Sequence, residues 1–227
     1  MVKHMLIITG GTVDIEWLKS ISPSCFKKGS QTKVMAADRG LFYAKQAGLA
    51  VDYILGDFDS VPAGVLDEYQ NSQVQIRTYP PEKDYTDTHL ALLWAVEEGA
   101  ESVTIIGGMG TRFDHSFANI GLLSMLLEQG VKGEILDPYN RIFMMDKEHV
   151  SQVRIHSERG KKEYISLIPY TEKVTGITLE GFKYPLNNET LTIGISRGIS
   201  NELMEEEGLI QIEEGMLIVS ISRDEAL

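Results

Sequence analysis

Short apolar runs and amphipathic stretches alternate through residues 1–136 of this chain. Apolar runs of strand length occupy 6–8, 33–37, 53–55, 102–106 and 133–136. Between them, 41–48, 88–98 and 116–129 carry apolar residues at helical spacing, and each stretch ends at or just before a glycine. Strands that alternate with helices favour a parallel sheet covered by helices. The predicted fold class of this part is therefore a Rossmann-like α/β domain.

A different pattern follows residue 146. The apolar runs there are short and rich in β-branched residues, and they occupy 164–168, 174–179, 190–193, 209–212 and 215–221. Turn residues separate these runs at intervals typical of β-sandwiches. We therefore predict two domains, an α/β domain over 1–140 and a C-terminal β-sandwich domain over 141–227. The boundary is expected between Asp137 and Val150.

Polar and glycine-rich loops follow the predicted strands of the first domain. They lie at 10–11, 38–40, 56–60 and 107–114. In open α/β sheets, ligands bind beyond the carboxyl ends of the strands, where such loops meet. We therefore expect the functional site at this edge of the sheet.

Charge and composition exclude several classes of function. The chain has 33 acidic and 21 basic residues, a net charge of −12, and no basic run. A generic nucleic-acid binder carries a basic face, so we expect no nucleic-acid partner. The single cysteine, Cys25, cannot form an internal disulfide, which favours a reducing compartment. No apolar stretch reaches the ~18 residues that a membrane span needs. We expect a cytoplasmic protein with no membrane partner.

The segment from Gly56 to Ser60 places Asp57 and Asp59 directly after an apolar strand. Mg²⁺ prefers hard oxygen ligands and commonly takes one or two carboxylates together with substrate phosphates. If the strand continues, the two aspartates share one face and Phe58 points the other way, into packing. An aspartate-rich turn with local backbone hydrogen bonds explains the same residues. The motif alone leaves both interpretations open.

The segment 80–89 leads into the helix predicted over 88–98. Asp84 or Thr86 can cap the start of this helix, and Asp84 and Asp87 share a helical face if both lie in its first turn. Lys83, at the helix entrance, is suitably placed to bind a phosphate. Capping and the helix dipole explain one aspartate readily. They explain the whole group less well.

The glycine-rich segment 107–115 follows a strand. Glycines at such a position let backbone N–H groups approach an anion closely, and Arg112 adds charge-assisted donors for phosphate oxygens. The spacing fits neither the Walker A pattern nor Gly-x-Gly-x-x-Gly. The alternative is a flexible turn with a surface pair between Arg112 and Asp114. Together, the three segments predict a magnesium–nucleotide site that is not a P-loop.

These segments, in this order, resemble the thiamine pyrophosphokinase family. The resemblance rests on Gly-Asp-Phe-Asp-Ser at 56–60, Glu-Lys-Asp-Tyr-Thr-Asp at 82–87, Gly-Gly-Met-Gly-Thr-Arg-Phe-Asp-His at 107–115, and the segments 181–186 and 199–202. It implies that a pyrophosphoryl group passes from ATP to the hydroxyethyl oxygen of thiamine, giving thiamine diphosphate and AMP. It also implies an α/β domain followed by a β-sandwich, and a homodimer with its sites at the subunit interface.

The resemblance further implies roles for single residues of the first domain. The Mg²⁺ ligands would be Asp57, Asp59 and Asp87. The ATP-binding groups would be Asp38, Lys83, Asp84, Arg112 and the backbone of Gly107, Gly108 and Gly110. Asp114 matches a position at the reaction centre, where it would orient Arg112 or the attacking hydroxyl.

The thiamine-binding residues implied by the resemblance lie in the second domain. They are Tyr184, Ser200 and Asn201, with Tyr184 stacking on the pyrimidine ring. The chain departs from the family pattern at two positions. Thr111 stands where many relatives have glycine, and a positive φ there would strain a threonine. Tyr184 stands where some relatives have tryptophan.

Two rival functions stay open at this stage. A metal-dependent glycosyl- or nucleotidyl-transferase would also use an Asp-x-Asp pair such as Asp57 and Asp59. A sensor that kept the fold would bind a nucleotide or thiamine without turnover, although the intact carboxylates argue against it. Release of AMP in step with thiamine diphosphate distinguishes the predicted enzyme from both.

Overall fold

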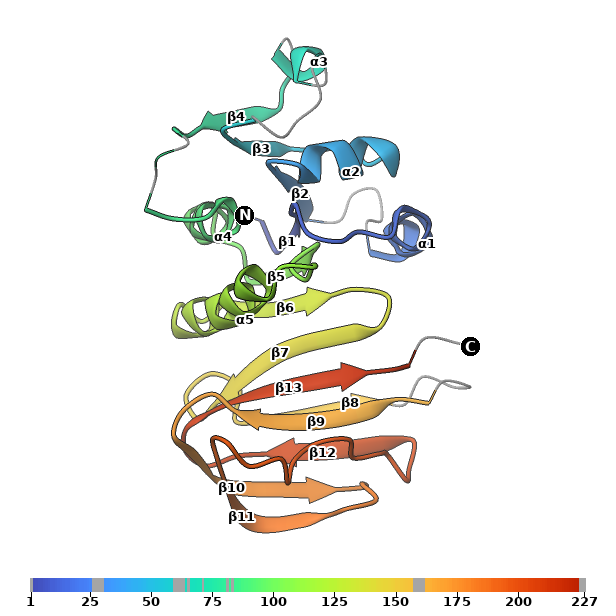
Figure 1. Cartoon of the computed structure of the whole chain (residues 1–227), viewed down its shortest axis with the longest axis vertical. Coiled ribbons are helices and arrows are strands. Elements are labelled where there is room, and N and C mark those ends of the chain that lie inside the picture. Colours follow the sequence, from blue (N-terminus) through green and yellow to red (C-terminus); the bar gives the residue numbers. More distant parts are fainter. Residues whose placement is uncertain are drawn as a thin grey trace. The chain divides into compact units, whose positions relative to one another are not determined.

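The computed structural model of the chain describes residues 2–25, 31–58, 64, 66–70, 72–80, 82, 84–156 and 162–224. The chain divides into two compact units, Met1–Pro138 and Tyr139–Leu227. Figure 1 shows that the first combines helices and strands and that the second is built from strands. No helix within the described ranges has the length and apolar character needed to span a membrane.

The first unit is a parallel sheet with helices on both faces. Its strands are β1 (His4–Ile8), β2 (Thr32–Ala37), β3 (Tyr53–Gly56), β4 (Gln75–Thr78), β5 (Ser102–Ile106) and β6 (Lys132–Leu136). Its helices are α1 (Ile15–Cys25), α2 (Gly40–Gln46), α3 (Asp67–Gln70), α4 (Asp87–Glu97) and α5 (Phe113–Glu128). The strands lie in the order β4-β3-β2-β1-β5-β6, and each neighbouring pair is parallel.

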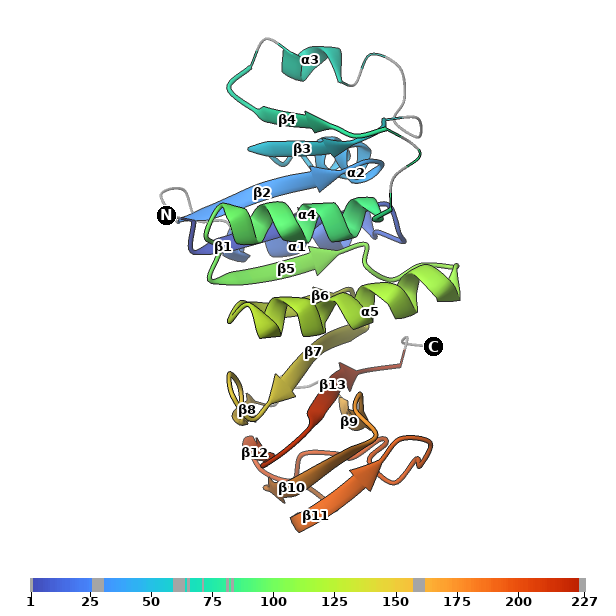
Figure 2. The same cartoon turned by 90° about the vertical axis from the view of Figure 1, so that its left-hand side faces the viewer.

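Helices cover the two faces of this sheet in pairs. Figures 1 and 2 show α1 and α2 on one face and α4 and α5 on the other. Leu18 of α1 and Leu41 of α2 join the core formed by Leu6, Ile8 and neighbouring strand residues. Strands β1, β2 and β3 are largely buried on both faces, which explains why they read as continuous apolar runs in the sequence. The predicted α/β class is confirmed.

The second unit is a sandwich of two antiparallel sheets. Its strands are β7 (Asn140–Asp146), β8 (Gln152–His156), β9 (Tyr164–Pro169), β10 (Lys173–Glu180), β11 (Leu186–Thr192), β12 (Glu207–Gln211) and β13 (Met216–Ser222). Strands β7, β13 and β9 form one sheet, and β11, β10, β12 and β8 form the other. Both sheets contribute to one apolar core, for example through Val219 and Ile165 from the first and Ile177 and Ile210 from the second.

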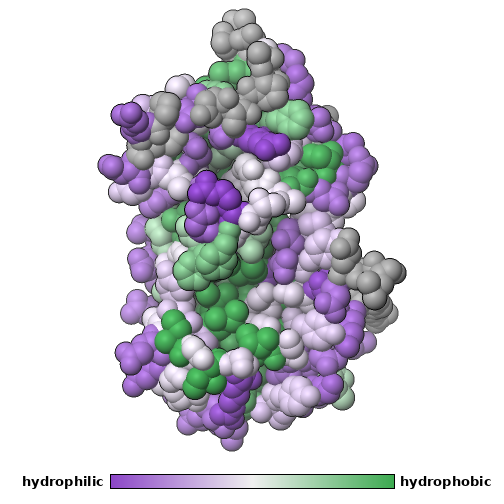
Figure 3. Space-filling model, viewed as in Figure 1, coloured by the Kyte–Doolittle hydropathy of each residue, from purple (hydrophilic) through white to green (hydrophobic). Residues whose placement is uncertain are grey.

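The second unit also carries large apolar side chains on its surface. Ile193 is 61% exposed, Ile195 59% and Met204 69%. Figure 3 shows hydrophobic residues, in green, on the face of this unit that is turned toward the reader. Exposed apolar side chains that gather on one face are commonly a site of association between protein chains.

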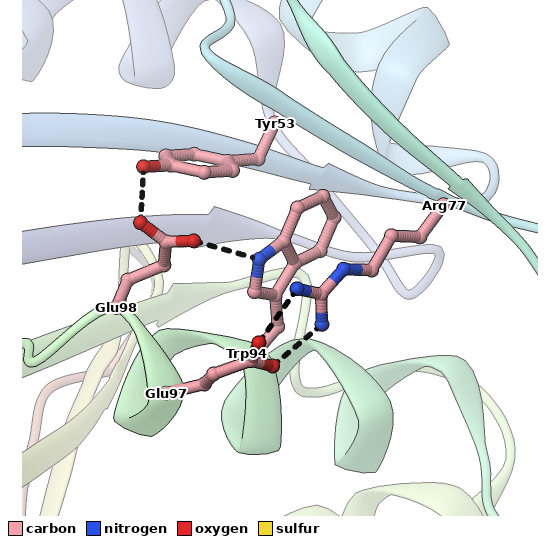
Figure 4. Close-up of polar contacts among 5 residues, drawn as sticks. All are labelled: Tyr53, Arg77, Trp94, Glu97 and Glu98. Carbon is pink, nitrogen blue, oxygen red and sulfur yellow. Dashed lines mark hydrogen bonds and ion pairs between the residues drawn. The ribbon is translucent and has the colours of Figure 1, made fainter.

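Side-chain contacts fix the C-terminal half of α4 to the sheet (Figure 4). Arg77 of β4 makes a bidentate ion pair with Glu97, at 2.7 and 2.9 Å, and its guanidinium lies 4.1 Å from the ring centroid of Trp94. Glu98 accepts hydrogen bonds from the hydroxyl of Tyr53, at 2.8 Å, and from the indole N–H of Trp94, at 3.1 Å. These contacts join β3 and β4 to α4, whose other end lies at the carboxyl edge of the sheet.

Candidate active site at the carboxyl edge of the parallel sheet

A cavity of about 790 Å³ lies at the carboxyl edge of the sheet in the first unit. Its walls come from the loops after β1, β2 and β5 and from the start of α4, over the segments 9–13, 37–39, 84–88 and 107–112. The cavity brings together residues of all three sequence motifs. Its volume is in the range of ordinary small-molecule sites, about 300–1,000 Å³.

The ends of β2 and β3 meet in one corner of the cavity. Asp38 follows β2 with φ +50°, and its backbone N–H donates to the carbonyl of Leu55 at 2.7 Å. A Cβ at Gly56 would lie 3.1 Å from the Cα of Asp38, and Gly56 has φ +150°, so a glycine suits this close approach. Asp38 and Asp57 both line the cavity as a result.

The residue after Asp57 departs from the predicted strand geometry. Strand β3 ends at Gly56, and Phe58 has φ +62°. The strand therefore ends before Asp57, and the expectation that Asp57 and Asp59 share one face of a continuing strand is not met. Phe58 does pack against the apolar core of the first unit, as expected. Asp59 lies outside the described residues, as does Ser60.

Helix α4 starts at Asp87, with Thr86 as its N-cap. The hydroxyl of Thr86 accepts a hydrogen bond from the backbone N–H of His89 at 3.2 Å. Asp84 precedes the cap, so Asp84 and Asp87 do not both lie in the first helical turn, and the condition for a shared helical face is not met. Both residues nevertheless line the cavity. The Oδ1 atom of Asp87 is buried at the positive end of the helix dipole. Lys83 lies outside the described residues.

The glycine loop after β5 packs against the end of β1. Gly107 has φ +75°, and a Cβ there would lie 2.6 Å from the carbonyl oxygen of Thr9, so both the conformation and the space require glycine. Helix α5 begins at Phe113, three residues before the predicted start, with Arg112 in the N-cap position. Asp114 therefore lies in the first helical turn and not in the loop.

Arg112 and Asp114 form the ion pair that the sequence suggested. The Nε and Nη2 atoms of Arg112 lie 3.2 and 2.5 Å from the two carboxylate oxygens of Asp114. Both side chains are about two-thirds exposed, so the pair adds little stability. The hydrogen bond from Arg112 lowers the pKa of Asp114. The two contacts hold the guanidinium of Arg112 against the carboxylate of Asp114.

The carboxylates around the cavity have the donor chemistry that Mg²⁺ requires. Asp38, Asp57, Asp84 and Asp87 all line it and offer hard oxygen ligands. Among the residues that the structure describes, no three His, Cys, Asp or Glu side chains form a metal-binding group by themselves. Two carboxylates with substrate phosphates suffice for Mg²⁺, so the donor set fits a metal that is bound together with its nucleotide.

Tyr184 and Asn201 lie together in the second unit. The side chain of Asn201 is buried, accepts from the backbone N–H of Tyr184 at 3.0 Å, and donates to its carbonyl at 2.8 Å. The Tyr184 side chain itself is 60% exposed. Ser200 has φ +59°, and its backbone N–H donates to the hydroxyl of Ser166 at 3.0 Å. Asn201 thus contacts the backbone of Tyr184, and Ser200 directly precedes Asn201 in the chain. The three predicted thiamine-binding residues therefore lie close together.

Comparison with known protein families matches both units of the chain. Residues 27–135 match the model of the thiamin pyrophosphokinase catalytic domain, and residues 151–217 match that of the thiamin pyrophosphokinase vitamin B1 binding domain. Thiamine pyrophosphokinase of Bacillus subtilis is 35% identical over 190 residues, which are 84% of this chain and 87% of that protein. The chain belongs to the thiamine pyrophosphokinase family.

Solved structures of the family have the same fold. The crystal structure of thiamine pyrophosphokinase from Bacillus subtilis matches with a TM-score of 0.85 and 30% identity, over 98% of this chain and 100% of that one. The structure from Geobacillus thermodenitrificans matches with a TM-score of 0.81 and 31% identity, over 98% and 99%. The predicted family, its thiamine pyrophosphokinase activity and the use of ATP by the family are confirmed.

One departure from the thiamine pyrophosphokinase pattern is accommodated without strain. The described residues other than glycine that have a positive φ are Asp38, Phe58, Asn188 and Ser200. Thr111 is not among them, so threonine fits the loop without the left-handed conformation that would have strained it.

Sequence reasoning missed the polar residues that hold the glycine loop. Thr9, Ser116 and Asn119 line the cavity and are buried. Ser116 and Asn119 are three residues apart just after the Arg112 motif, which places them on one face of a helix. That spacing was the available signal for these two. Thr9 had no local signal because its partner is 98 residues away.

Proposed function

We propose that this chain catalyses Mg²⁺-dependent transfer of the pyrophosphoryl group of ATP to the hydroxyethyl oxygen of thiamine, giving thiamine diphosphate and AMP. One observation carries the proposal at the level of the site. A single cavity of the first unit gathers Asp38, Asp57 and Asp87 with a glycine loop and Arg112. Phosphoryl transfer depends chiefly on positioning and on stabilising charge, and these groups supply both.

The phosphates of ATP are proposed to bind at the glycine loop. The backbone of Gly107, Gly108 and Gly110 lines this part of the cavity and faces the phosphate oxygens, while the N–H of Gly110 itself donates to the hydroxyl of Ser116. Arg112 and Lys83 add positive charge. Asp114 holds the guanidinium of Arg112 in place, at the distances given above. Arg112 is exposed in the structure, which leaves it accessible to a nucleotide that enters the cavity.

Asp57, Asp59 and Asp87 are proposed as the Mg²⁺ ligands. If Mg²⁺ is bound there together with ATP, it would neutralise negative charge on the phosphates as the reaction proceeds. Asp38 and Asp84 line the same cavity and are proposed to orient water and Lys83 near the nucleotide. The start of α4 fixes Asp87, because Thr86 caps the helix at the adjacent position.

Tyr184, Ser200 and Asn201 are proposed to bind thiamine. The exposed ring of Tyr184 stacks on the pyrimidine ring, which is worth about 0.5–1.5 kcal/mol beyond burial. Asn201 supports this role by holding the backbone of Tyr184 from both sides. In the reaction, the thiamine hydroxyl oxygen bonds to the β-phosphorus, the bond from that phosphorus to the bridging oxygen of AMP breaks, and the hydroxyl proton passes to solvent.

The active form is proposed to be a homodimer with sites at the subunit interface. Large apolar side chains on the surface of the second unit, among them Ile193, Ile195 and Met204, support association. Such an assembly would let residues of the second unit take part in a site that the first unit begins.

The nucleotide product tests the proposal. Purified protein incubated with ATP, Mg²⁺ and thiamine is expected to release AMP in equal amount with thiamine diphosphate. Release of ADP, or hydrolysis of ATP that does not depend on thiamine, would contradict it. The same assay decides against a glycosyl- or nucleotidyl-transferase, which would not form thiamine diphosphate, and against a sensor, which would bind without turnover.

A further inference from the structure

Two buried side chains hold carbonyl groups of the glycine loop. The hydroxyl of Thr9, at the end of β1, donates to the carbonyl of Gly107 at 2.6 Å. The side-chain amide of Asn119, in α5, donates to the carbonyl of Gly108 at 2.7 Å. The loop is therefore held by hydrogen bonds from a strand end and from a helix.

The next part of the loop is held in the same way. The carbonyl of Met109 accepts from the backbone N–H of Thr12 at 2.8 Å. The N–H of Gly110 donates to the hydroxyl of Ser116 at 3.0 Å, and this hydroxyl also lies 3.0 Å from the carbonyl of Arg112. Each peptide from Gly107 to Gly110 thus has a hydrogen-bonding partner in the β1 loop or in α5.

The side chains that hold this loop are both polar and buried, which few side chains of the structure are. Six polar side chains are buried among the residues that the structure describes, and Thr9, Ser116 and Asn119 are three of them. Burying a polar group is unfavourable unless it is hydrogen-bonded. Three of the six buried polar side chains make hydrogen bonds to the 107–110 loop or to Arg112, the N-cap of α5.

The planar peptide bond turns these contacts into a constraint on the loop's N–H groups. In a trans peptide, the carbonyl of one residue and the N–H of the next point in opposite directions. When Thr9 holds the carbonyl of Gly107, the N–H of Gly108 must face away from Thr9. When Asn119 holds the carbonyl of Gly108, the N–H of Met109 must face away from Asn119. The peptide between Met109 and Gly110 shows the same rule, since Thr12 binds its carbonyl and Ser116 its N–H.

We propose that Thr9, Ser116 and Asn119 are positioning residues that hold the peptides of the 107–110 loop in the orientation that binds the phosphates of ATP. This inference rests on the proposed function of the cavity. None of the three side chains needs to touch ATP for this role. They prevent the loop from turning a carbonyl oxygen, which repels an anion, toward the phosphates.

Thr9 offers an isosteric test with a matched control. Thr9→Val keeps the shape of the side chain and removes the hydroxyl donor, so the carbonyl of Gly107 loses the 2.6 Å hydrogen bond and keeps the one from the backbone N–H of Gly11 at 3.0 Å. Thr9→Ser keeps the hydroxyl. Thr104 is also a buried threonine, and its hydroxyl donates to Glu134 at 2.9 Å, away from the cavity, so Thr104→Val is the control. We expect Thr9→Val to raise the KM for ATP at least ~10-fold with little change in the KM for thiamine, and Thr9→Ser to recover most of the affinity.

The positioning role predicts a loss of affinity for the nucleotide that can be measured without turnover. Calorimetric titration with a non-hydrolysable ATP analogue and Mg²⁺, without thiamine, is expected to show at least ~10-fold weaker binding for Thr9→Val and Asn119→Asp. Asn119→Asp replaces the donor by an acceptor, which repels the carbonyl of Gly108. Because it also adds a negative charge to the cavity wall, Asn119→Leu, which only removes the donor, must show the same loss. Thr104→Val is expected to bind as the wild-type protein does. If Thr9→Val fails to fold, Asn119→Asp and Ser116→Ala test the same loop.

The outcomes separate this inference from the proposed function. Wild-type protein that binds the analogue but forms no AMP, with weaker binding in the variants, supports the positioning role and contradicts the proposed reaction. Wild-type turnover with unchanged analogue binding in folded Thr9→Val and Asn119→Asp overturns the positioning role and leaves the reaction standing. Equal losses in Thr104→Val and Thr9→Val overturn it as well, because they would reflect stability alone.

Discussion

Asp38, Phe58 and Ser200 adopt the left-handed backbone conformation, with φ of +50°, +62° and +59°. Outside glycine this conformation costs on the order of 1–3 kcal/mol and persists only where the surroundings enforce it. Core packing holds Phe58, and hydrogen bonds to Leu55 and Ser166 hold Asp38 and Ser200. All three residues are at or beside proposed ligand positions. At the scale of single residues, these strained backbone positions therefore lie at or beside the residues of the proposed site.

The proposed metal ligands give the first prediction at this scale. Asp59→Asn and Asp87→Asn each replace a carboxylate oxygen by an amide nitrogen and should lower turnover at least ~100-fold, or about 2.7 kcal/mol of barrier. Asp14→Asn is the control, because asparagine can still accept the hydrogen bond from the N–H of Trp17. Near-normal activity of both folded variants in a steady-state assay over a range of Mg²⁺ concentrations would remove these residues from the metal site.

A second residue-scale prediction concerns pH. Asp146 accepts from the ring Nδ1 of His149 at 2.8 Å and from its backbone N–H at 2.7 Å. The side-chain hydrogen bond raises the pKa of His149 above 6.5. Burial opposes ionisation of Asp146, but hydrogen bonds from His149 and Val150 outweigh it and lower the pKa below 3.8. The histidine's stabilisation is complete below pH 6.5 and disappears as the pH rises through its raised pKa. The aspartate's is complete above pH 3.8 and disappears as the pH falls through its lowered pKa.

The free energy of unfolding lost in His149→Gln should therefore be largest between about pH 3.8 and pH 6.5 and smaller on either side. Urea denaturation of both proteins across this range measures the difference. Glutamine does not titrate, and the backbone contacts to Asp146 remain. A difference that stays constant from pH 5 to pH 9 would show that the pair makes no titrating contribution.

At the scale of elements, the contacts of Arg77 hold α4 against the edge of the sheet. Arg77→Ala removes both the ion pair with Glu97 and the contact over the Trp94 ring. We expect it to lower the free energy of unfolding by about 1–2 kcal/mol, because a cation–π contact and a bidentate pair each contribute about 0.5–1 kcal/mol when partly exposed. Arg77→Lys should retain part of this.

Chemical denaturation checks this prediction, and α1 supplies the control. Lys19 pairs with Glu16 at the helix surface, where the two side chains are 45% and 83% exposed. Lys19→Ala should therefore change stability by no more than about 0.5 kcal/mol. If Arg77→Ala is no less stable than Lys19→Ala, the Arg77 contacts do not stabilise the packing of α4 against the sheet.

Local pattern predicted the buried elements well and predicted poorly the exposed edge strand β4 and the start of α5, which has no side-chain cap. Strand β5 was predicted over its full range, Ser102–Ile106, because three of its five residues are buried and apolar and a fourth, the β-branched Thr104, is also buried. Strand β4, Gln75–Thr78, was missed because it is a short edge strand with polar residues and no buried position. The start of α5 was missed because Arg112, its N-cap, makes no side-chain capping hydrogen bond, so the sequence carries no cap signal.

The candidate site also contains residues that local pattern predicted and residues that it missed. Asp38, Asp57 and Gly107 directly follow apolar strands, and the rule that ligands bind at the carboxyl edge of a sheet was enough to bring them together. Thr9 and Asn119 were not found, because their roles depend on a contact between β1 and β5 and on the packing of α5. The contact of Thr9 with a residue 98 positions away leaves no local pattern in the sequence. The spacing of Ser116 and Asn119 shows that they share a helix face, but not what that face contacts.

At the scale of the whole molecule, the proposed dimer gives the last prediction. Ile193 and Ile195, beyond the end of β11, are each about 60% exposed, and burying an isoleucine side chain is worth about 1.5–3 kcal/mol. The double variant Ile193→Glu/Ile195→Glu should therefore weaken self-association at least ~10-fold and lower turnover at concentrations where the wild type is dimeric. Sedimentation velocity over a range of concentrations measures the association. Leu93→Glu, which changes an apolar side chain 40% exposed on α4 of the first unit, is the matched control and should remain associated. Full turnover by a wild-type protein that sediments as a monomer would contradict the proposed assembly, because a site shared between subunits cannot be complete in one chain.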